Sequence, residues 1–175
     1  QWENARQEAR CQISEANRYY IRWSHQIKTP IAALRLLLEE EEPDRAAMEG
    51  EIYRIEQYVE FALQYQRLEG GHKDLVFAHY SLESIVKKAL KKTGVLFRRT
   101  KLALELGNLQ TDVLTDEKWL VFVLEQVLTN AVKYTRKGKI SIYLDPEKEK
   151  TLVVEDTGMG IRPEDLPRIF EWGYT

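Results

Sequence analysis

The sequence predicts an antiparallel helical hairpin followed by an α+β sandwich, and three observations support this fold class. Up to about Gly71, apolar residues recur at alternating spacings of three and four, which is the pattern of helices packed in a bundle. After Gly71, short apolar runs are interleaved with helical stretches, which is typical of strands and helices in separate layers. Gly70 and Gly71 separate the two patterns. We therefore expect two domains, residues 1–71 and 72–175, with the boundary between Gly70 and Asp74.

The first domain is predicted to contain two helices. The acidic segment 39–44, which includes Pro43, interrupts the apolar pattern between them. Asp44 is a suitable N-cap for the second helix, and the glycine pair at 70–71 is a suitable end. The predicted seam of the first helix comprises Ile13, Ala16, Tyr20, Trp23, Ile27, Pro30 or Ile31, and Leu34. The seam of the second comprises Met48, Ile52, Ile55, Val59 and Ala62, and it is widened by Tyr58, Phe61, Tyr65 and Leu68.

The apolar stripe of the second helix is wider than one partner helix can cover. We therefore expect two chains to pair into a four-helix bundle, so that the homodimer is the predicted state. The alternative is a monomer in which the hairpin folds back on the second domain.

The second domain is predicted to alternate strands and helices. Ser81 is the expected N-cap of its first helix, which should reach about Lys92, and a longer helix is expected over 116–134. Strands are expected at 76–80, 102–106, 139–144 and 151–155, and a charged turn at 145–150 joins the last two. The final strand leads directly into 156–160. The helices should cover one face of a mixed sheet.

The composition excludes several classes of function. A net charge of −2 and a pI of about 6.0 argue against a protein that binds nucleic acid through its phosphates. The single cysteine, Cys11, cannot form an internal disulfide, which favours a reducing compartment. The longest apolar run, 119–124, is far shorter than the ~20 residues of a membrane-spanning helix. Because the chain starts at Gln1 and stops at Thr175 without a helix cap or tail, we expect a piece of a longer protein with any membrane anchor upstream.

His25 lies between seam positions of the first helix, so its side chain is expected on the exposed face. Most exposed histidines are only solvated polar residues. Here, however, Thr29 lies one turn further on the same face, and Pro30 removes a backbone amide and opens the helix locally. A neutral imidazole, with an ordinary pKa of about 6.5, is a competent nucleophile at physiological pH.

A second group of candidate residues lies at the end of the long helix and in the segment 156–160. The Asn130 carbonyl suits a Mg²⁺ ion that takes its other ligands from phosphates, and Lys133 on the same face can meet phosphate charge. Asp156 can accept a hydrogen bond from an exocyclic amine such as that of adenine, a bond worth roughly 1.5–3 kcal/mol. Gly158 and Gly160 are expected to let the backbone approach the ligand closely.

These segments together resemble a known family. The segments 25–30, 130–134, 156–160 and 169–171 are similar to the H, N, first glycine and F boxes of sensor histidine kinases, in order and approximate spacing. The resemblance covers nearly the whole chain. It implies a dimeric hairpin for dimerisation and histidine phosphotransfer, followed by a Bergerat-type ATP-binding domain. The segments around His25, 119–126 and 170–175 further resemble the short membrane kinases of Firmicutes that work beside peptide-antibiotic transporters.

The resemblance implies that His25 is phosphorylated from ATP and passes the phosphoryl group to an Asp of a response regulator receiver domain. It makes Asn130 a Mg²⁺ ligand, with Gln126 one turn earlier as a second carbonyl, and gives Thr29 a water for dephosphorylating the regulator. The other residues that it assigns to the ATP site are Lys133, Tyr134, Asp156, Gly158, Gly160, Ile161 and Phe170. The chain would be the cytoplasmic portion of a kinase anchored in the bacterial cell membrane.

The sequence departs from the family pattern at two places. Gln26 replaces the acidic residue that usually follows the acceptor histidine, which predicts a slow but real kinase. No lid or second glycine box follows Thr175, so weak nucleotide binding and weak or no activity are expected of this chain. Two alternatives stay open: an ATPase of the chaperone, gyrase or mismatch-repair type, and a catalytically impaired dimerisation and scaffold module.

Overall fold

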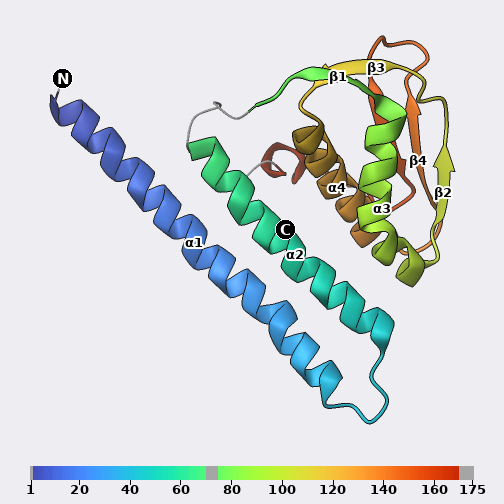
Figure 1. Ribbon diagram of the computed structural model, residues 1–175, viewed down its shortest axis with the longest axis horizontal. Coiled ribbons are helices and arrows are strands. Elements are labelled where there is room, and N and C mark those ends of the chain that lie inside the picture. Colours follow the sequence, from blue (N-terminus) through green and yellow to red (C-terminus); the bar gives the residue numbers. More distant parts are fainter. Residues whose placement is uncertain (1, 70–74, 170–175) are drawn as a thin grey trace. The chain divides into compact units, whose positions relative to one another are not determined.

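The computed structural model describes residues 2–69 and 75–169 and divides the chain into two compact units, residues 1–75 and 76–175 (Figure 1). The first unit contains α1 (Trp2–Leu38) and α2 (Arg45–Glu69). The second contains, in order, β1 (Ala78–Ser81), α3 (Leu82–Thr100), β2 (Ala103–Leu106), β3 (Asp112–Thr115), α4 (Glu117–Tyr134), β4 (Lys139–Leu144), β5 (Leu152–Asp156) and the short 3₁₀ helix η1 (Leu166–Arg168). The predicted fold class, a helical hairpin followed by an α+β domain, is confirmed.

The two helices of the first unit run antiparallel and are joined by an exposed acidic turn (Figure 1). Asp44 begins α2 as predicted, because its carboxylate accepts hydrogen bonds from the amides of Ala46 at 2.9 Å and Ala47 at 3.1 Å. Pro30 lies inside α1 and is buried, and the helix continues through it for two more turns. The second helix of the hairpin therefore begins where the sequence predicts.

Aromatic side chains hold the two helices together. Tyr19 of α1 stacks on Tyr65 of α2 with ring centroids 3.8 Å apart, and Tyr20 meets both rings edge-on. Burial, followed by the neighbouring Tyr20 and Tyr65, raises the pKa of Tyr19 to about 12. The Trp23 indole N–H donates to the Tyr58 carbonyl. These contacts bury the tyrosine side of α2 against α1.

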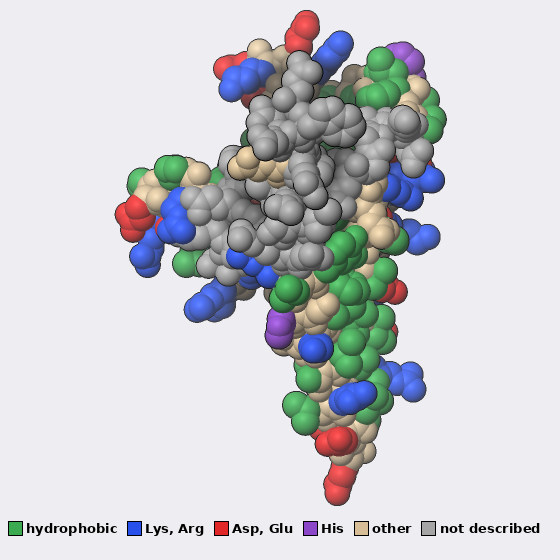
Figure 2. All heavy atoms as spheres, turned by 90° about the vertical axis from the view of Figure 1, so that its left-hand side faces the viewer, with side chains coloured by type: hydrophobic (Ala, Val, Ile, Leu, Met, Phe, Trp, Pro, Cys, Tyr) green, Lys and Arg blue, Asp and Glu red, His purple; other side chains and the backbone are tan. Residues whose placement is uncertain are grey.

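Only part of the predicted seam of α2 packs against α1. Tyr53 and Gln64, which were not predicted to lie in the seam, are buried at 6% and 3% exposure. Ile52 and Val59 were predicted to lie in the seam, but they remain 44% and 41% exposed. Leu63 beside them is 47% exposed. Because α1 packs on the tyrosine side, it leaves this aliphatic stripe of α2 uncovered. In Figure 2, hydrophobic side chains are gathered in a strip along the hairpin.

The second unit contains two small sheets. β1 and β3 form an antiparallel ribbon in which His79 lies opposite Leu114. β2, β4 and β5 form a mixed sheet, with β2 parallel to β4 and β4 antiparallel to β5. β3 was not predicted, and β1 begins two residues later than expected. The amide of Val76 is used elsewhere, donating to the Asp116 carboxylate at 2.9 Å.

The core of the second unit lies between the helices α3 and α4 and one face of the three-stranded sheet. Its fully buried members come from both layers: Ile85, Val86 and Ala89 of α3, Leu128 of α4, and Ile140 and Ile142 of β4. α3 extends about two turns beyond the predicted Lys92, because Leu96 and Phe97 also pack on this core. The Ser81 side chain caps α3 as predicted, accepting from the Ser84 amide.

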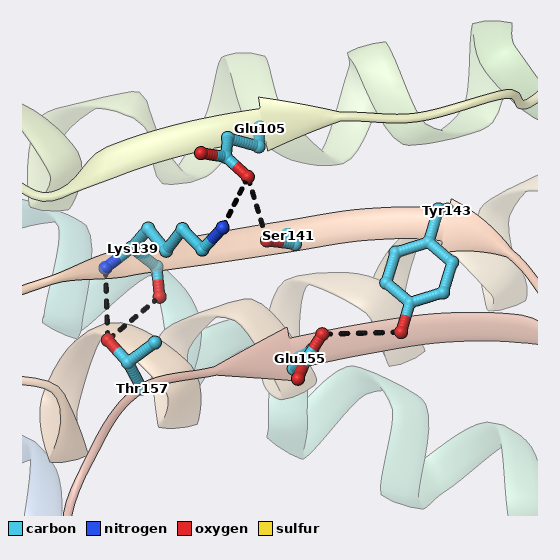
Figure 3. A network of polar contacts seen from close by, with 6 residues as sticks. All are labelled: Glu105, Lys139, Ser141, Tyr143, Glu155 and Thr157. Atoms are coloured by element: carbon cyan, nitrogen blue, oxygen red, sulfur yellow. Dashed lines mark hydrogen bonds and ion pairs between the residues drawn. The ribbon is translucent and has the colours of Figure 1, made fainter.

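The other face of the sheet is polar (Figure 3). Glu105 of β2 is paired with Lys139 of β4 at 2.7 Å, and Tyr143 donates to Glu155 of β5 at 3.2 Å. The hydrogen bond with the Glu105 carboxylate raises the pKa of Lys139. Cross-strand pairs of this kind fix the register of the strands that lead into 156–160.

None of the helices in the described parts of the chain combines the length and the hydrophobicity that a membrane-spanning segment requires.

Candidate functional site

The first candidate site is the exposed face of α1 around His25. Trp23 and Ile27 point toward the hairpin interior and are half-buried, whereas His25, Gln26 and Thr29 are exposed. The structure therefore places the imidazole, and the hydroxyl one turn further on, where a second molecule can reach them. This exposure is what the sequence predicts for His25.

The second candidate site begins at the C-terminal end of α4. The helix is held at its start by Asp116, whose carboxylate accepts the amides of Trp119 at 3.1 Å and Val76 at 2.9 Å. Ala131 and Val132 anchor its last turns in the core, at 5% exposure each. Asn130, Lys133 and Tyr134 consequently face outward.

The outward side of α4 carries groups suited to phosphates and a metal ion. The Lys133 ammonium lies 4.8 Å from the centroid of the Tyr134 ring. Asn130 is exposed, and Gln126, one turn before it, is half-buried. Groups of three or more His, Cys, Asp or Glu able to hold a metal are absent from the described residues. Two amide carbonyls nevertheless fit Mg²⁺, because this ion keeps several waters and takes most of its other ligands from substrate phosphates.

Asp156 is the last residue of β5 and lies against the end of α4. Its Oδ1 atom accepts two hydrogen bonds, from the Gly158 amide at 2.8 Å and from the Thr135 hydroxyl at 3.3 Å. The Met159 amide donates to the Tyr134 carbonyl at 3.3 Å. The segment 156–160 is thus bound directly to the C-terminal end of α4, which brings Tyr134 and Asp156 together.

Thr157 ties the same segment to the start of β4 (Figure 3). Its hydroxyl accepts from the Lys139 amide at 3.0 Å and donates to the Lys139 carbonyl at 3.3 Å. Gly138 makes room for this hydroxyl, since a Cβ there would lie 2.0 Å from Thr157 Oγ1 and the Gly138 φ is +122°. The segment is therefore fixed from two sides.

The expectation for Gly158 needs correction. A Cβ on Gly158 would lie 2.6 Å from the Tyr134 carbonyl oxygen and 2.6 Å from Asp156 Oδ1. Gly158 therefore makes room for the protein's own atoms. Gly160 has a φ of +70°, and a Cβ there would meet nothing within 4 Å, so it is Gly160 that keeps open space beside the segment.

The remaining predicted residues differ in how much the structure shows of them. Ile161 is 53% exposed, next to Met159 at 80%. Phe170 lies outside the described residues. Thr135, which contacts Asp156, was missed by the sequence analysis. Its position directly after Asn130–Tyr134, at the end of a helix, was the available signal.

Comparison with known proteins is consistent with this geometry. Residues 115–175 match the family described as "Histidine kinase-, DNA gyrase B-, and HSP90-like ATPase". This match begins just before α4 and leaves the hairpin out. The sensor histidine kinase GraS of Staphylococcus epidermidis is 33% identical over 172 residues, which are 96% of this chain and 50% of GraS. That similarity includes the hairpin, which the gyrase and chaperone alternative does not explain.

The chain belongs to the sensor histidine kinases. A second member, the sensor protein BceS of Halalkalibacterium halodurans, is 38% identical over 156 residues, which are 87% of this chain and 47% of BceS. The chain spans about half the length of these curated relatives. The histidine kinase ThkA, solved in complex with the response regulator protein TrrA, shares the fold with a TM-score of 0.62 and 21% identity, covering 95% of this chain and 53% of that one.

Proposed function

We propose that this chain carries the autokinase and phosphotransfer steps of a sensor histidine kinase. The observation that carries the proposal is the exposed imidazole of His25 in a chain whose second unit presents the features of an ATP site. The hairpin would be the dimerisation and phosphotransfer domain, and the second unit the ATP-binding domain.

In the proposed reaction, a neutral ring nitrogen of His25 attacks the γ-phosphorus of ATP. The bond from this phosphorus to the bridging oxygen breaks, ADP leaves with that oxygen, and the imidazole carries the phosphoryl group. The group then passes to a carboxylate of an Asp in a response regulator, which frees the imidazole again. Catalysis in such transfers consists mostly of positioning and charge stabilisation.

The residues of the second unit would bind and orient the nucleotide. Asp156 accepts the amine of adenine, Tyr134 lies beside the base, and Lys133 meets phosphate charge. Asn130, with Gln126, would hold Mg²⁺, and the bound ion would neutralise charge on the phosphate oxygens. Gly160, Ile161 and Phe170 would complete the surroundings of the nucleotide, while Gly158 lets the segment 156–160 lie close to the end of α4.

Two residues beside His25 have proposed roles of their own. The Gln26 amide can orient the imidazole but cannot neutralise the positive charge that develops on it, so phosphorylation should be slow. The Thr29 hydroxyl lies on the same exposed face and can hold a water against the phosphorylated regulator. Phosphatase activity toward the regulator would follow from that water.

The exposed aliphatic stripe of α2 supports a homodimer. Ile52, Val59 and Leu63 recur at spacings of seven and four, so they lie on one side of the helix. A second copy of the hairpin would cover them and complete a four-helix bundle. The kinase would work on the cytoplasmic side of a bacterial membrane, where ATP and the response regulator are found.

Incubation of the full chain with Mg²⁺ and γ-labelled ATP tests the proposal. We expect a label that is lost in acid and stable in base, as a phosphorylated imidazole is, and none on the His25→Gln variant. His79→Gln is the matched control, because His79 is also exposed but lies on β1. Label that persists on His25→Gln would exclude His25 as the acceptor. ATP binding with no label on any variant would contradict the proposed autokinase step in this chain and favour the scaffold alternative.

A further inference from the structure

The two carboxylate oxygens of Asp156 have different surroundings. Oδ1 accepts both the Gly158 amide at 2.8 Å and the Thr135 hydroxyl at 3.3 Å. Among the described residues, Oδ2 makes no hydrogen bond. One oxygen of the carboxylate is therefore fixed by the protein, and the other remains available to a ligand.

Thr135 is itself held rigidly. It is the C-cap of α4, where its amide donates to the Ala131 carbonyl at 3.1 Å, and its side chain is buried at 2% exposure. A Cβ on Gly158 would come within 2.9 Å of Thr135 Oγ1, so the hydroxyl and the backbone of the segment 156–160 are in close contact. A buried hydroxyl must be hydrogen-bonded, and the acceptor that Thr135 finds is Asp156 Oδ1.

A carboxylate that is held at one oxygen only by a backbone amide can still turn about its Cβ–Cγ bond. A second donor from another element restricts this rotation. Thr135 belongs to the end of α4 and Gly158 to the segment after β5, so the two donors approach Oδ1 from different parts of the fold. Their combined effect is to hold Oδ2 in one direction.

We propose that Thr135 is a positioning residue for base selection: by holding Oδ1, it directs Oδ2 of Asp156 toward the exocyclic amine of a 6-aminopurine. The inference rests on the proposed function, because it takes Asp156 as the adenine contact. It assigns to Thr135 a part of the preference for adenine over a purine that lacks the amine. Thr135 itself does not touch the nucleotide.

Binding of two matched ligands to the full chain tests this inference. ADP carries the exocyclic amine, and the diphosphate of purine riboside lacks it. We expect the wild type to bind ADP about tenfold or more tightly than the analogue, as befits a hydrogen bond to a charged group. Thr135→Val should reduce this preference about fivefold through weaker ADP binding, while the affinity for the analogue stays constant.

Two further variants make the test specific. Thr135→Ser keeps the hydroxyl and should keep the preference. Thr151→Val makes the same chemical change just before the start of β5, where the Thr151 hydroxyl donates to the Glu149 carbonyl at 3.2 Å, so the preference should also be kept. In the labelling reaction, Thr135→Val should raise the KM for ATP and leave kcat unchanged. Thr135→Ala removes the hydroxyl without adding a buried methyl group, and replaces the valine variant if that one unfolds.

The outcomes separate this inference from the proposed function. If the hydroxyl-free variants keep the wild-type preference for ADP, the role of Thr135 is wrong and the role of Asp156 stands. If the wild type binds both ligands equally, Asp156 does not read the amine, and both the inference and the proposed adenine contact fail. A loss of affinity for both ligands together in Thr135→Ala would show a purely structural role and would also overturn the inference.

Discussion

His25 and Gln26 are neighbours on the exposed face of α1, and they differ in how well the sequence predicts their behaviour. The exposure of His25 follows from helical spacing, because its neighbours Trp23 and Ile27 take the buried side. The effect of Gln26 depends on charge that appears only during the reaction. It therefore has to be measured as a rate.

Gln26→Glu should speed phosphorylation of His25. A carboxylate beside the ring stabilises the developing positive charge, and charge-assisted hydrogen bonds are about twice as strong as neutral ones. We expect a gain on the order of 1 kcal/mol, or several-fold in the initial rate of labelling from ATP. Gln7→Glu, on an exposed position of the same helix, should have no effect. An unchanged or slower rate in Gln26→Glu would refute this account of residue 26.

Gly158→Ala should damage the second site. The added Cβ would lie 2.6 Å from both the Tyr134 carbonyl oxygen and Asp156 Oδ1, so the segment 156–160 must move away from α4. We expect a loss of about 1–3 kcal/mol of unfolding free energy, measured in urea, and weaker nucleotide binding.

Gly94→Ala is the control for that substitution. Gly94 lies inside α3, and a Cβ there would meet only Arg98 Nη1, at 3.8 Å. This variant should be about 0.5–1 kcal/mol more stable than the wild type because alanine is the better helix former. Equal stability of the two variants would show that the contacts of Gly158 do not constrain the segment.

α4 depends on its first residues as well as on its last. Burial alone would raise the pKa of Asp116, but hydrogen bonds from the backbone amides of Val76, Trp119 and Lys118 lower it below the ordinary value of 3.8. The carboxylate therefore stabilises the fold above the pKa that it has in the unfolded chain. This stabilisation is lost as the pH falls through the lower, folded pKa.

Asp116→Ala should remove the cap of α4 together with the anchor of Val76. We expect the free energy of unfolding to fall by about 1–2 kcal/mol at neutral pH. The difference from the wild type should shrink below about pH 4, where the wild-type carboxylate also becomes protonated. Urea unfolding at pH 7 and at pH 3 measures this difference in unfolding free energy. A difference that stays constant between the two pH values would show that the charge of Asp116 contributes nothing.

The elements were predictable to different degrees. α4 and β4 follow from long, regular patterns, and their predicted limits agree with the structure within one residue. β3 has four residues, too few for alternation to stand out. α3 was predicted to end at about Lys92, whereas the structure continues it to Thr100. The core contacts of Leu96 and Phe97 carry the helix past the predicted end, and such contacts are visible only in three dimensions.

The candidate site shows the same division. Asn130, Lys133 and Asp156 could be proposed from the sequence because their residue types match a ligand's chemistry at recognisable spacing. For Thr135 the sequence offers only its position directly after Asn130–Tyr134, because its proposed role is to hold another side chain. Helical periodicity also cannot tell which apolar residues of α2 face α1. The tyrosine stacking decides that, and it leaves Ile52 and Val59 exposed.

Ile52→Asp should prevent formation of the proposed dimer. A charge at this position would have to be buried between two hairpins, which is unfavourable, whereas in a single chain it would face water. Light scattering at micromolar concentration should give twice the 20.6 kDa of one chain for the wild type and a single-chain mass for the variant. Leu114→Asp, at a 63% exposed position of β3, should remain dimeric. A monomeric wild-type chain would refute the proposed four-helix bundle.

The close contacts of Gly158 affect whether a glycine at this position indicates nucleotide binding or only the fold. Its missing side chain makes space for the carbonyl of Tyr134 and the carboxylate of Asp156, which belong to the same chain. A descendant that had lost its nucleotide would still be more stable with glycine there. In a chain of this architecture the glycine is therefore a sign of inherited shape, and Asp156, with the Thr135 hydroxyl that holds it, would be the better sign that the proposed nucleotide contact has been kept.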